Sequence, residues 1–316
     1  MTYFSIITPL FNKGNYISET ISSVRGQKMP DWEMIIIDNG STDCGPSIAH
    51  QYAQLDSRIH VIEFTNRQGP GAARNAGLQI AIGQWVLFLD SDDLIEPDYL
   101  AHRYKVAANL TKVQIIVGKW QEFEDIAPEK RVEKQPTQWK GDTSKIVETA
   151  IAYAPWALHA AIVRRDWLTQ ERKWIEQLDQ VSSEDTAFWF TTVRGANIVW
   201  CDDADALYRI HTFNSRNMIC DPAKWIQSVS KIIEHNLDYL KQKQMFPNPT
   251  QCENIFRVFE SLYRLALKSE LYSESQELQK LVYKFMNMSP PNLGIITRKV
   301  IGLRMFNFLR YGITYK

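Results

Sequence analysis

The chain has 316 residues, of which 45% are hydrophobic, enough for a large core organised as one domain or two. Lysine plus arginine and aspartate plus glutamate balance at 36 each, so no overall field favours nucleic acid or a membrane as the main partner. The four cysteines form no CxxC pair, which argues against a zinc site and for free thiols in a reducing compartment.

The beginning of the chain predicts neither export nor membrane insertion. Its first residues, MTYFSIITPLF, lack a basic segment and a long apolar stretch, so we expect no signal peptide. No window approaches the ~18 consecutive apolar residues of a membrane span. We therefore expect a cytoplasmic protein. Peripheral contact with the inner face of the plasma membrane is a further alternative.

The N-terminal part alternates short apolar runs with segments of helical spacing. Continuous apolar strands separated by amphipathic helices indicate a mostly parallel sheet with helices on both faces. Ligands of such sheets bind beyond the carboxyl ends of the strands. The apolar runs predict strands at 3–8, 33–38, 59–64, 85–89 and 114–118.

The rest of the chain changes character twice. Residues 121–145 are polar and hold two prolines, which predicts a long loop, and short strands return at 197–201 and 206–211. After about residue 220 only helical spacing is left. We therefore expect two domains, 1–218 with the sheet and 219–316 as a helical extension.

An acidic triplet ends the fourth predicted strand. Asp90, Asp92 and Asp93 stand within four residues, and such crowding is unfavourable unless positive charge lies among them. One interpretation is ordinary surface turn chemistry. The other is a divalent cation, because hard carboxylate oxygens together with substrate phosphates suit Mg²⁺ or Mn²⁺. Asp38 also ends a predicted strand, the second one, which favours a site at that edge of the sheet.

A glycine-rich segment, NRQGPGAARNAG, opens the third predicted helix. A dinucleotide fingerprint belongs after the first strand, whereas this segment follows the third and has Arg74 in place of the last glycine. We expect its small residues to allow close helix packing and close approach of a ligand. Arg74 could pair with a phosphate, with one of the aspartates, or in a purely structural salt bridge. Asp43 is interpreted as a helix cap.

Six motifs occur in a fixed order between about residues 3 and 215: TPLFN, DNGSTD, GPGAARNAGL, FLDSDD, SSEDTAFW and ALYRIHTFNS. Each is weak alone, but the ordered set resembles family 2 glycosyltransferases with the GT-A fold. The resemblance implies a nucleotide-sugar site formed by Thr8, Pro9, Phe11, Asp38, Arg74, Asp90, Ser91 and Asp92. Within it, Asp38 would hold uracil, and Asp92 would bind a metal that bridges the diphosphate. Asn39 departs from the aspartate common at its position.

The later acidic pair matches the catalytic motif of that family. Asp185 would be the catalytic base, with Glu184 beside it. The chemistry supports this assignment independently, because sugar transfer needs a base for the acceptor hydroxyl and neutralised charge on the departing diphosphate. One base and one metal suit a single displacement with inversion. We find no clear candidate for the nucleophile of a retaining reaction.

Two further residues carry open alternatives. His211 could complete the coordination of Mn²⁺ or Mg²⁺ or touch the diphosphate, but a lone histidine also often finishes a hydrogen-bond network. Trp156 is a candidate platform for the acceptor sugar, and plain packing is the alternative. Arg209 and Arg216 are either phosphate clamps or ordinary ion pairs.

The last segment, 292–316, has five basic residues and no acidic one. Ile296, Val300, Leu303 and Phe306 are predicted on one helical face, although two glycines weaken the helix. A basic amphipathic helix suits an anionic membrane surface, and docking on its own protein is the alternative.

The sequence thus predicts an inverting, metal-dependent hexosyl or N-acetylhexosaminyl transferase. The expected donor is a UDP-sugar, and the expected acceptor is a saccharide or a lipid-linked oligosaccharide of bacterial surface polysaccharide synthesis. A nucleotidyltransferase is a rival, but the segment after the first strand lacks a glycine- and lysine-rich phosphate loop. A non-catalytic sugar-nucleotide binding module is a second rival, and it would need no catalytic base.

Overall fold

The computed structural model describes residues 2–136, 143–211 and 221–311. The chain divides into two compact units. The first comprises 1–146, 154–180 and 188–215 and contains the sheet, and the second comprises 147–153, 181–187 and 216–316. The predicted boundary between residues 218 and 219 lies outside the described residues.

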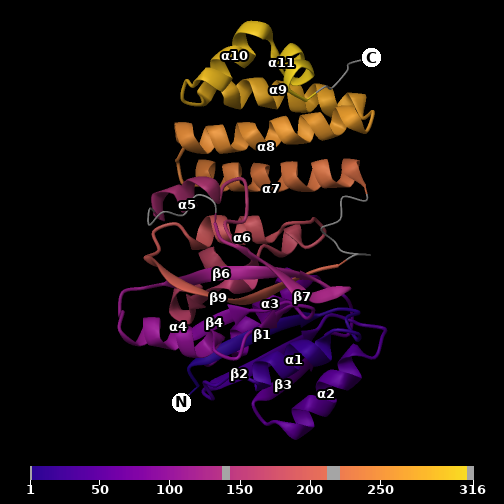
Figure 1. The fold of residues 1–316 in the computed structure, drawn as a ribbon, viewed down its shortest axis with the longest axis vertical. Helices are drawn as coiled ribbons and strands as arrows, with labels where there is room; N and C mark the ends of the chain where they lie inside the picture. The colour runs from indigo at the N-terminus through magenta and orange to yellow at the C-terminus, as the bar shows by residue number, and fades with distance from the viewer. Residues whose placement is uncertain (1, 137–142, 212–220, 312–316) are drawn as a thin grey trace. The chain divides into compact units, whose positions relative to one another are not determined.

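The first unit is built on one curled sheet with the strand order β3-β2-β1-β4-β8-β6-β9-β5, and β7 pairs with β6 (Figure 1). Strands β3, β2, β1 and β4 are mutually parallel, as are β6 and β9, whereas the other pairings are antiparallel. The strands are β1 (Phe4–Leu10), β2 (Trp32–Asp38), β3 (Ile59–Glu63), β4 (Trp85–Phe88), β5 (Leu94–Ile95), β6 (Ile115–Glu124), β7 (Ala127–Lys134), β8 (Ala161–Arg164) and β9 (Ile198–Ile210).

The helices between these strands follow the predicted alternation. Helix α3 packs against β1 and β2, α1 packs against α2 and β5, and α4 packs against β6 and β9. Strands β1, β2 and β4 are almost wholly buried, which explains why their sequences read as continuous apolar runs. The helices are α1 (Ile17–Arg25), α2 (Gly45–Leu55), α3 (Pro70–Ile80), α4 (Tyr99–Ala108), α5 (Thr143–Thr149) and α6 (Asp185–Thr192).

The register of the parallel strands brings their carboxyl ends to one edge. Leu10 of β1 lies opposite Asp38 of β2, and Ile7 lies opposite Phe88 of β4. The acidic triplet begins two residues beyond Phe88, so it leaves the sheet beside the segment that follows β1. The structure therefore places the motifs after β1, β2 and β4 at the same edge, as the sequence predicted.

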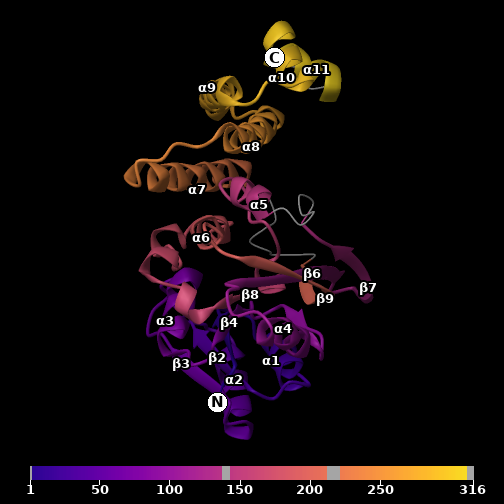
Figure 2. The same cartoon turned by 90° about the vertical axis from the view of Figure 1, so that its left-hand side faces the viewer.

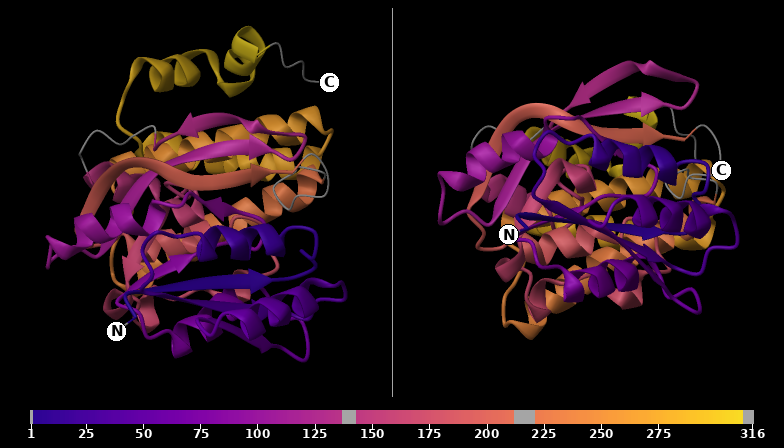
Figure 3. Two further views of the ribbon diagram at one scale, coloured as in Figure 1. Left: turned by 60° about the horizontal axis from the view of Figure 1, so that its bottom comes forward. Right: turned by 90° about the horizontal axis from the view of Figure 1, so that it is seen from below.

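Two predictions for the middle of the chain were wrong. The polar stretch expected as a loop instead extends β6 to Glu124 and forms the antiparallel partner β7. The two short strands expected near 197–211 are one long strand, β9, which curves beside β6 with a bulge between Cys201 and Ala206 (Figure 3). Backbone pairing to β6 stabilises both segments, so they need no apolar periodicity.

The second unit contains five consecutive helices, α7 to α11, in its described part (Figure 2). Asp221 caps α7, and Asn248 with Gln251 forms a capping box on α8. Both helices begin at a proline, which suits the first helical position because an N–H there would have no partner within the helix. No helix among the described residues is long and apolar enough to cross a bilayer. The helices are α7 (Pro222–Gln242), α8 (Pro249–Lys268), α9 (Tyr272–Met288), α10 (Leu293–Ile301) and α11 (Leu303–Tyr311).

The amino ends of β1 and β4 are fastened by a buried polar cluster. Glu33 accepts hydrogen bonds from the Ser5 hydroxyl and the Ile82 amide, and the Gly83 amide donates to Ser5 Oγ at 2.9 Å. A Cβ at Gly83 would stand 2.6 Å from the Ser5 amide nitrogen and 2.7 Å from the Phe4 carbonyl carbon. This turn therefore accepts only glycine without a backbone shift.

We expect Gly83→Ala to lower the free energy of unfolding by about 1–3 kcal/mol, because the added methyl group must displace the backbone of β1. Chemical denaturation measures the change. Gln84→Ala, at the exposed neighbouring position, is the control and should change stability by less than about 0.5 kcal/mol. Equal stability of the two variants would contradict the close contact.

Candidate active site

Each aspartate of the acidic triplet has at least one basic partner, and the partners come from different parts of the chain. Asp90 pairs with Arg74 of α3, with 2.6 Å between the carboxylate oxygen and the guanidinium nitrogen. Asp92 pairs with Lys13 and His211, and Asp93 pairs with His159. The negative charges are therefore tolerated because cationic and imidazole groups from distant parts of the chain surround them.

Two basic side chains stabilise the charged form of Asp92. Its Oδ2 lies 2.5 Å from Lys13 Nζ and 2.6 Å from His211 Nε2. Burial alone would raise the pKa of Asp92, but the hydrogen bond from His211 and the charge of Lys13 outweigh it and lower this pKa to about 2. The same hydrogen bond raises the pKa of His211. Asp92 is therefore a carboxylate at neutral pH.

Strand pairing explains how His211 reaches this position. Glu124 of β6 lies opposite Ile210 of β9, so Asp125 and His211 leave the sheet together. Asp125 Oδ1 lies 2.8 Å from the Arg209 guanidinium, and Asp125 Oδ2 lies 3.4 Å from His211 Nδ1. Arg209 also donates to the Asp92 carbonyl oxygen at 2.7 Å. Arg209 is thus held in ion pairs, whereas Arg216 lies outside the described residues.

Sequence analysis missed two residues of this network. Lys13 lies in the TPLFN-KGNY segment, where it was counted only as evidence against a phosphate loop. Asp125 lies in the stretch expected as a loop, and only the β6–β9 register shows that it stands next to His211. Only one sequence signal pointed to Lys13. It is a basic residue just beyond the end of the first strand, at the same edge of the sheet as the acidic triplet.

Asp93 has a structural environment that differs from that of its neighbours. It is buried, it accepts a hydrogen bond from the Arg209 amide at 2.8 Å, and its other oxygen lies 3.2 Å from His159 Nδ1. His159 lies in the short 3-10 turn Leu158–Ala160 and is fully buried. Burial raises the pKa of Asp93 against the effect of His159. Asp93 does not cap the following helix, because Asp98 is the residue directly before α4.

The side chains of the DNGSTD motif after β2 accept hydrogen bonds mainly from nearby backbone amides. The buried Asp38 carboxylate accepts hydrogen bonds from the Gly40 and Ser41 amides. Asn39 Oδ1 accepts from the Gln68 and Gly69 amides and so holds the glycine-rich segment beside β2. The unusual asparagine therefore has a structural explanation, and the role of Asp38 in base recognition stays a prediction.

The other residues assigned to the nucleotide-sugar site lie at the same edge. Thr8 and Ser91 are buried, and the Thr8 hydroxyl has no hydrogen-bond partner among the described residues. Pro9 is half-buried, and the Phe11 ring lies under the Arg67 guanidinium at 4.2 Å. These positions are compatible with a base pocket, and their contacts with a ligand stay predictions.

Asp43 lies directly before Cys44, the N-cap residue of α2, and bonds the first amide of that helix, which agrees with the capping interpretation. Its carboxylate accepts from the Gly45 amide at the start of α2 at 2.9 Å and from the Gly14 amide at 2.7 Å.

The glycine-rich segment binds a carboxylate from another part of the same chain. Asp179 accepts hydrogen bonds from the Gly71 amide at 2.7 Å and the Ala72 amide at 2.9 Å, at the amino end of α3. A Cβ at Gly69 would stand 2.2 Å from Asp179 Oδ2. The expected close packing is thus observed, and the anion at this helix end is Asp179.

The predicted catalytic pair and acceptor platform lie on or near α6. Asp185 is the first residue of α6, and Glu184 before it is buried. Trp156 is 3% exposed and its ring meets Trp189 edge-to-face, with 5.0 Å between the centroids. This contact favours the packing alternative for Trp156. The roles of Asp185 and Glu184 stay predictions.

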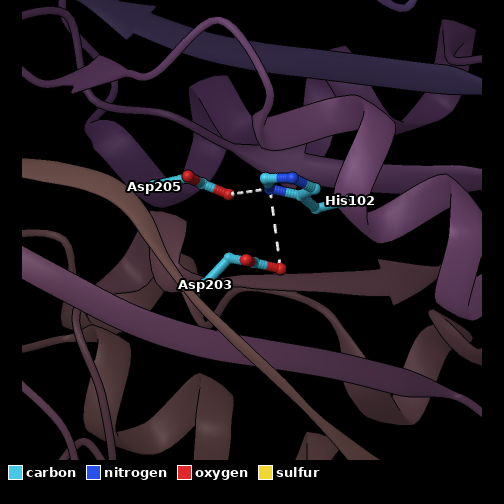
Figure 4. A group of neighbouring side chains, drawn as sticks. All are labelled: His102, Asp203 and Asp205. Atoms are coloured by element: carbon cyan, nitrogen blue, oxygen red, sulfur yellow. Dashed lines mark hydrogen bonds and ion pairs between the residues drawn. The ribbon is translucent and has the colours of Figure 1, made fainter.

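A second group of potential metal ligands lies away from the triplet. His102 of α4 faces Asp203 and Asp205, which the bulge of β9 presents (Figure 4). His102 Nδ1 lies 2.7 Å from Asp205 Oδ2 and 3.5 Å from Asp203 Oδ2. One imidazole and two carboxylates could hold a divalent ion. However, the buried Arg103 guanidinium lies 3.4 Å from Asp205 and already supplies positive charge there.

Comparison with known proteins shows which family the chain belongs to. The sequence pattern described as "Glycosyl transferase family 2" matches residues 5–169, more than half of the chain. The chain is a member of glycosyl transferase family 2. The matched residues include the whole edge formed by β1, β2 and β4 and the acidic triplet after β4.

Two relatives of this family 2 chain come from Bacillus subtilis. EpsH, which is named as a glycosyltransferase, is 41% identical over 121 residues, which are 38% of this chain and 35% of EpsH. TuaG, which is named for teichuronic acid biosynthesis, is 47% identical over 96 residues, which are 30% of this chain and 38% of TuaG. The chain thus matches little more than a third of the length of either relative.

Solved structures show that this family 2 chain has the GT-A fold. The S. aureus TarS fragment 1–349 in complex with UDP has a TM-score of 0.66 at 19% identity, with 100% of this chain and 93% of that chain covered. The mannosyltransferase PcManGT from Pyrobaculum calidifontis, in complex with GDP-Man and Mn²⁺, has a TM-score of 0.56 at 18% identity, with 98% and 81% covered.

We expect Asp179→Asn to lower the free energy of unfolding by about 1–2 kcal/mol, because an amide replaces the carboxylate that satisfies two amides at the start of α3. Thermal or urea denaturation measures the change. Asp202→Asn is the matched control, since Asp202 is exposed and pairs only at the surface. The capping role of Asp179 would be refuted if both variants were as stable as the parent.

Proposed function

We propose that the chain transfers a sugar from a nucleoside-diphosphate sugar, with UDP as the nucleotide, to a saccharide or lipid-linked acceptor. The observation that carries the proposal is the edge where the ends of β1, β2 and β4 meet and where Asp90 and Asp92 stand among basic groups. Family membership supports the reaction class. TuaG is named for teichuronic acid synthesis, and structures of TarS hold UDP and UDP-GlcNAc. These relatives support a role in bacterial surface polysaccharide synthesis.

The residues around Asp92 fit a divalent ion. Asp92 Oδ2 and His211 Nε2 converge within 2.6 Å, and a carboxylate with an imidazole is a donor set that Mn²⁺ and related ions accept. Asp92 and His211 would hold the ion, and Lys13 would have to leave the shared oxygen. When bound, such an ion neutralises charge on the departing diphosphate. The Mn²⁺ in PcManGT supports this choice.

The proposed reaction is one displacement with inversion at the anomeric carbon. The acceptor hydroxyl oxygen forms the new bond to that carbon while the bond from carbon to the diphosphate oxygen breaks. Asp185 takes the hydroxyl proton, and the nucleoside diphosphate leaves with the electron pair. A positioned general base contributes on the order of 10²–10⁴-fold. In this scheme Glu184 supports the base, and Asp38, Thr8, Pro9 and Phe11 form the base pocket.

The remaining residues of the edge have supporting roles in the proposal. Asp90, fixed by Arg74, would face the ribose or the donor sugar, with Ser91 beside it. Trp156 as an acceptor platform is the weakest element, because its ring is packed against Trp189. We place the reaction in the cytoplasm, at the inner face of the plasma membrane, where a lipid-linked acceptor would be available.

Substitution of Asp92 and of Asp185 should separate metal-dependent nucleotide binding from sugar transfer. We expect Asp92→Ala to abolish the Mn²⁺-dependent rise in melting temperature that UDP causes, because the metal loses its carboxylate ligand. We expect Asp185→Asn to keep this rise and to lose about 10²–10⁴-fold in transfer rate. Asp202→Ala is the control for both measurements. Transfer by Asp185→Asn at the parental rate would show that another group is the base.

Lys13 and a metal ion compete for one carboxylate oxygen. We expect Lys13→Met to bind Mn²⁺ alone roughly tenfold more tightly, because a positive charge no longer has to be displaced from Asp92. Titration followed by electron paramagnetic resonance of free Mn²⁺ measures the affinity without any substrate. Lys28→Met, which removes an exposed lysine paired with Asp98, is the control. An unchanged or weaker affinity in Lys13→Met would contradict the competition.

A further inference from the structure

One side of the C-terminal helices docks on the chain itself. Arg298 of α10 forms a buried bidentate pair with Glu260 of α8, with nitrogen–oxygen distances of 2.6 and 2.9 Å. The Arg298 guanidinium also lies 3.9 Å from the centre of the Phe306 ring of α11. Ile295 and Leu303 are buried as well. These contacts fix which sides of α10 and α11 face the protein.

The expected single amphipathic face does not exist. Gly302 has φ = 80° and separates α10 from α11, so apolar spacing does not continue from one helix to the next. Ile296 and Val300 are exposed, whereas Leu303 and Phe306 are buried. The prediction that these four residues share one face was therefore wrong, and the two alternatives for the segment apply to different sides of the helices.

The sides turned away from the protein are apolar. On α10, Leu293, Ile296 and Val300 recur at intervals of three and four and share one side, and Leu293 and Val300 are 81% and 77% exposed. On α11, Met305 and Leu309 are four residues apart, and Leu309 is 68% exposed. We call these five residues the outer apolar face. Single exposed apolar residues are normal, but five within seventeen residues indicate a binding surface.

The charge around the outer apolar face selects one kind of partner. Segment 292–316 carries five basic residues and no acidic one in a chain whose charges balance overall. Arg298 is buried and paired with Glu260, whereas Lys299 and Arg310 are exposed beside the apolar residues. Pairing two copies through this face would bring like charges together. An anionic lipid surface instead attracts basic groups and accepts apolar side chains.

We propose that α10 and α11 dock on an anionic membrane surface through the outer apolar face. Leu293, Ile296, Val300, Met305 and Leu309 enter the boundary between headgroups and acyl chains, while Lys299 and Arg310 contact the phosphate groups of the lipids. The buried Arg298–Glu260 pair holds α10 in the orientation that this docking needs. The binding is peripheral, and it places the chain where a lipid-linked acceptor would be found.

Sedimentation of the full chain with lipid vesicles tests the proposal. We expect binding to vesicles of phosphatidylcholine with phosphatidylglycerol, weaker binding to phosphatidylcholine alone, and loss of the difference at high salt. The double variant Leu293→Ser/Val300→Ser should bind roughly tenfold or more weakly, because several buried CH₂ groups are lost. Lys299→Glu should weaken binding only to the anionic vesicles.

Leu55→Ser is the matched control, because Leu55 is 73% exposed on α2 of the other unit, and it should bind like the parent. Equal melting temperatures establish that the variants are folded. Binding of the double variant at the level of Leu55→Ser would overturn the proposal, as would a parent that ignores anionic lipid. A parent that forms dimers, dispersed by the double variant, without binding vesicles would also overturn it. The vesicle assay does not measure sugar transfer, so its outcome does not depend on whether the proposed reaction is correct.

Discussion

The edge of the sheet depends on the neutralisation of three crowded carboxylates. Asp90, Asp92 and Asp93 leave β4 together, and their partners come from α3, from the segment after β1, from the end of β9 and from a 3-10 turn. None of these partners is close to the triplet in sequence. The site can therefore form only when the parallel and antiparallel halves of the sheet have assembled, and this couples the chemistry to the topology.

This arrangement also explains the different characters of the three carboxylates. Asp92 is held charged by Lys13 and His211, so it can serve as a ligand for a cation. Asp93 is buried with His159 and binds the backbone of β9, so it fastens the two halves of the sheet to each other. Asp90 is half-exposed and is fixed by Arg74. Adjacent residues of one type thus acquire separate functions from their surroundings.

Much of the fold was predictable because buried parallel strands have a strong sequence signature. The apolar runs that became β1, β2, β3 and β4 were located within about two residues, and the change to helical spacing after about residue 220 matches α7, α8 and α9. The ordered motifs identified the family. The hairpin β6–β7 was missed because both faces of β7 are largely solvated, so its sequence has no period of two that would indicate a strand.

The parts of the site that escaped prediction depend on register and on tertiary contact. Asp125 is next to His211 only because β6 and β9 are parallel neighbours with Glu124 opposite Ile210. The tail was misread because helical spacing was extended across Gly302, whose positive φ ends the first helix. In both cases a single backbone feature decided where the side chains went.

The carboxylate of Asp179 at the start of α3 has a consequence for selectivity. Helix termini of this kind attract any small oxyanion, including free phosphate or sulphate from the surroundings. Here a tethered side chain fills that position, and its tether gives it a high effective concentration there. A dissolved anion would therefore have to displace Asp179 before it could bind to the amides of the glycine-rich segment.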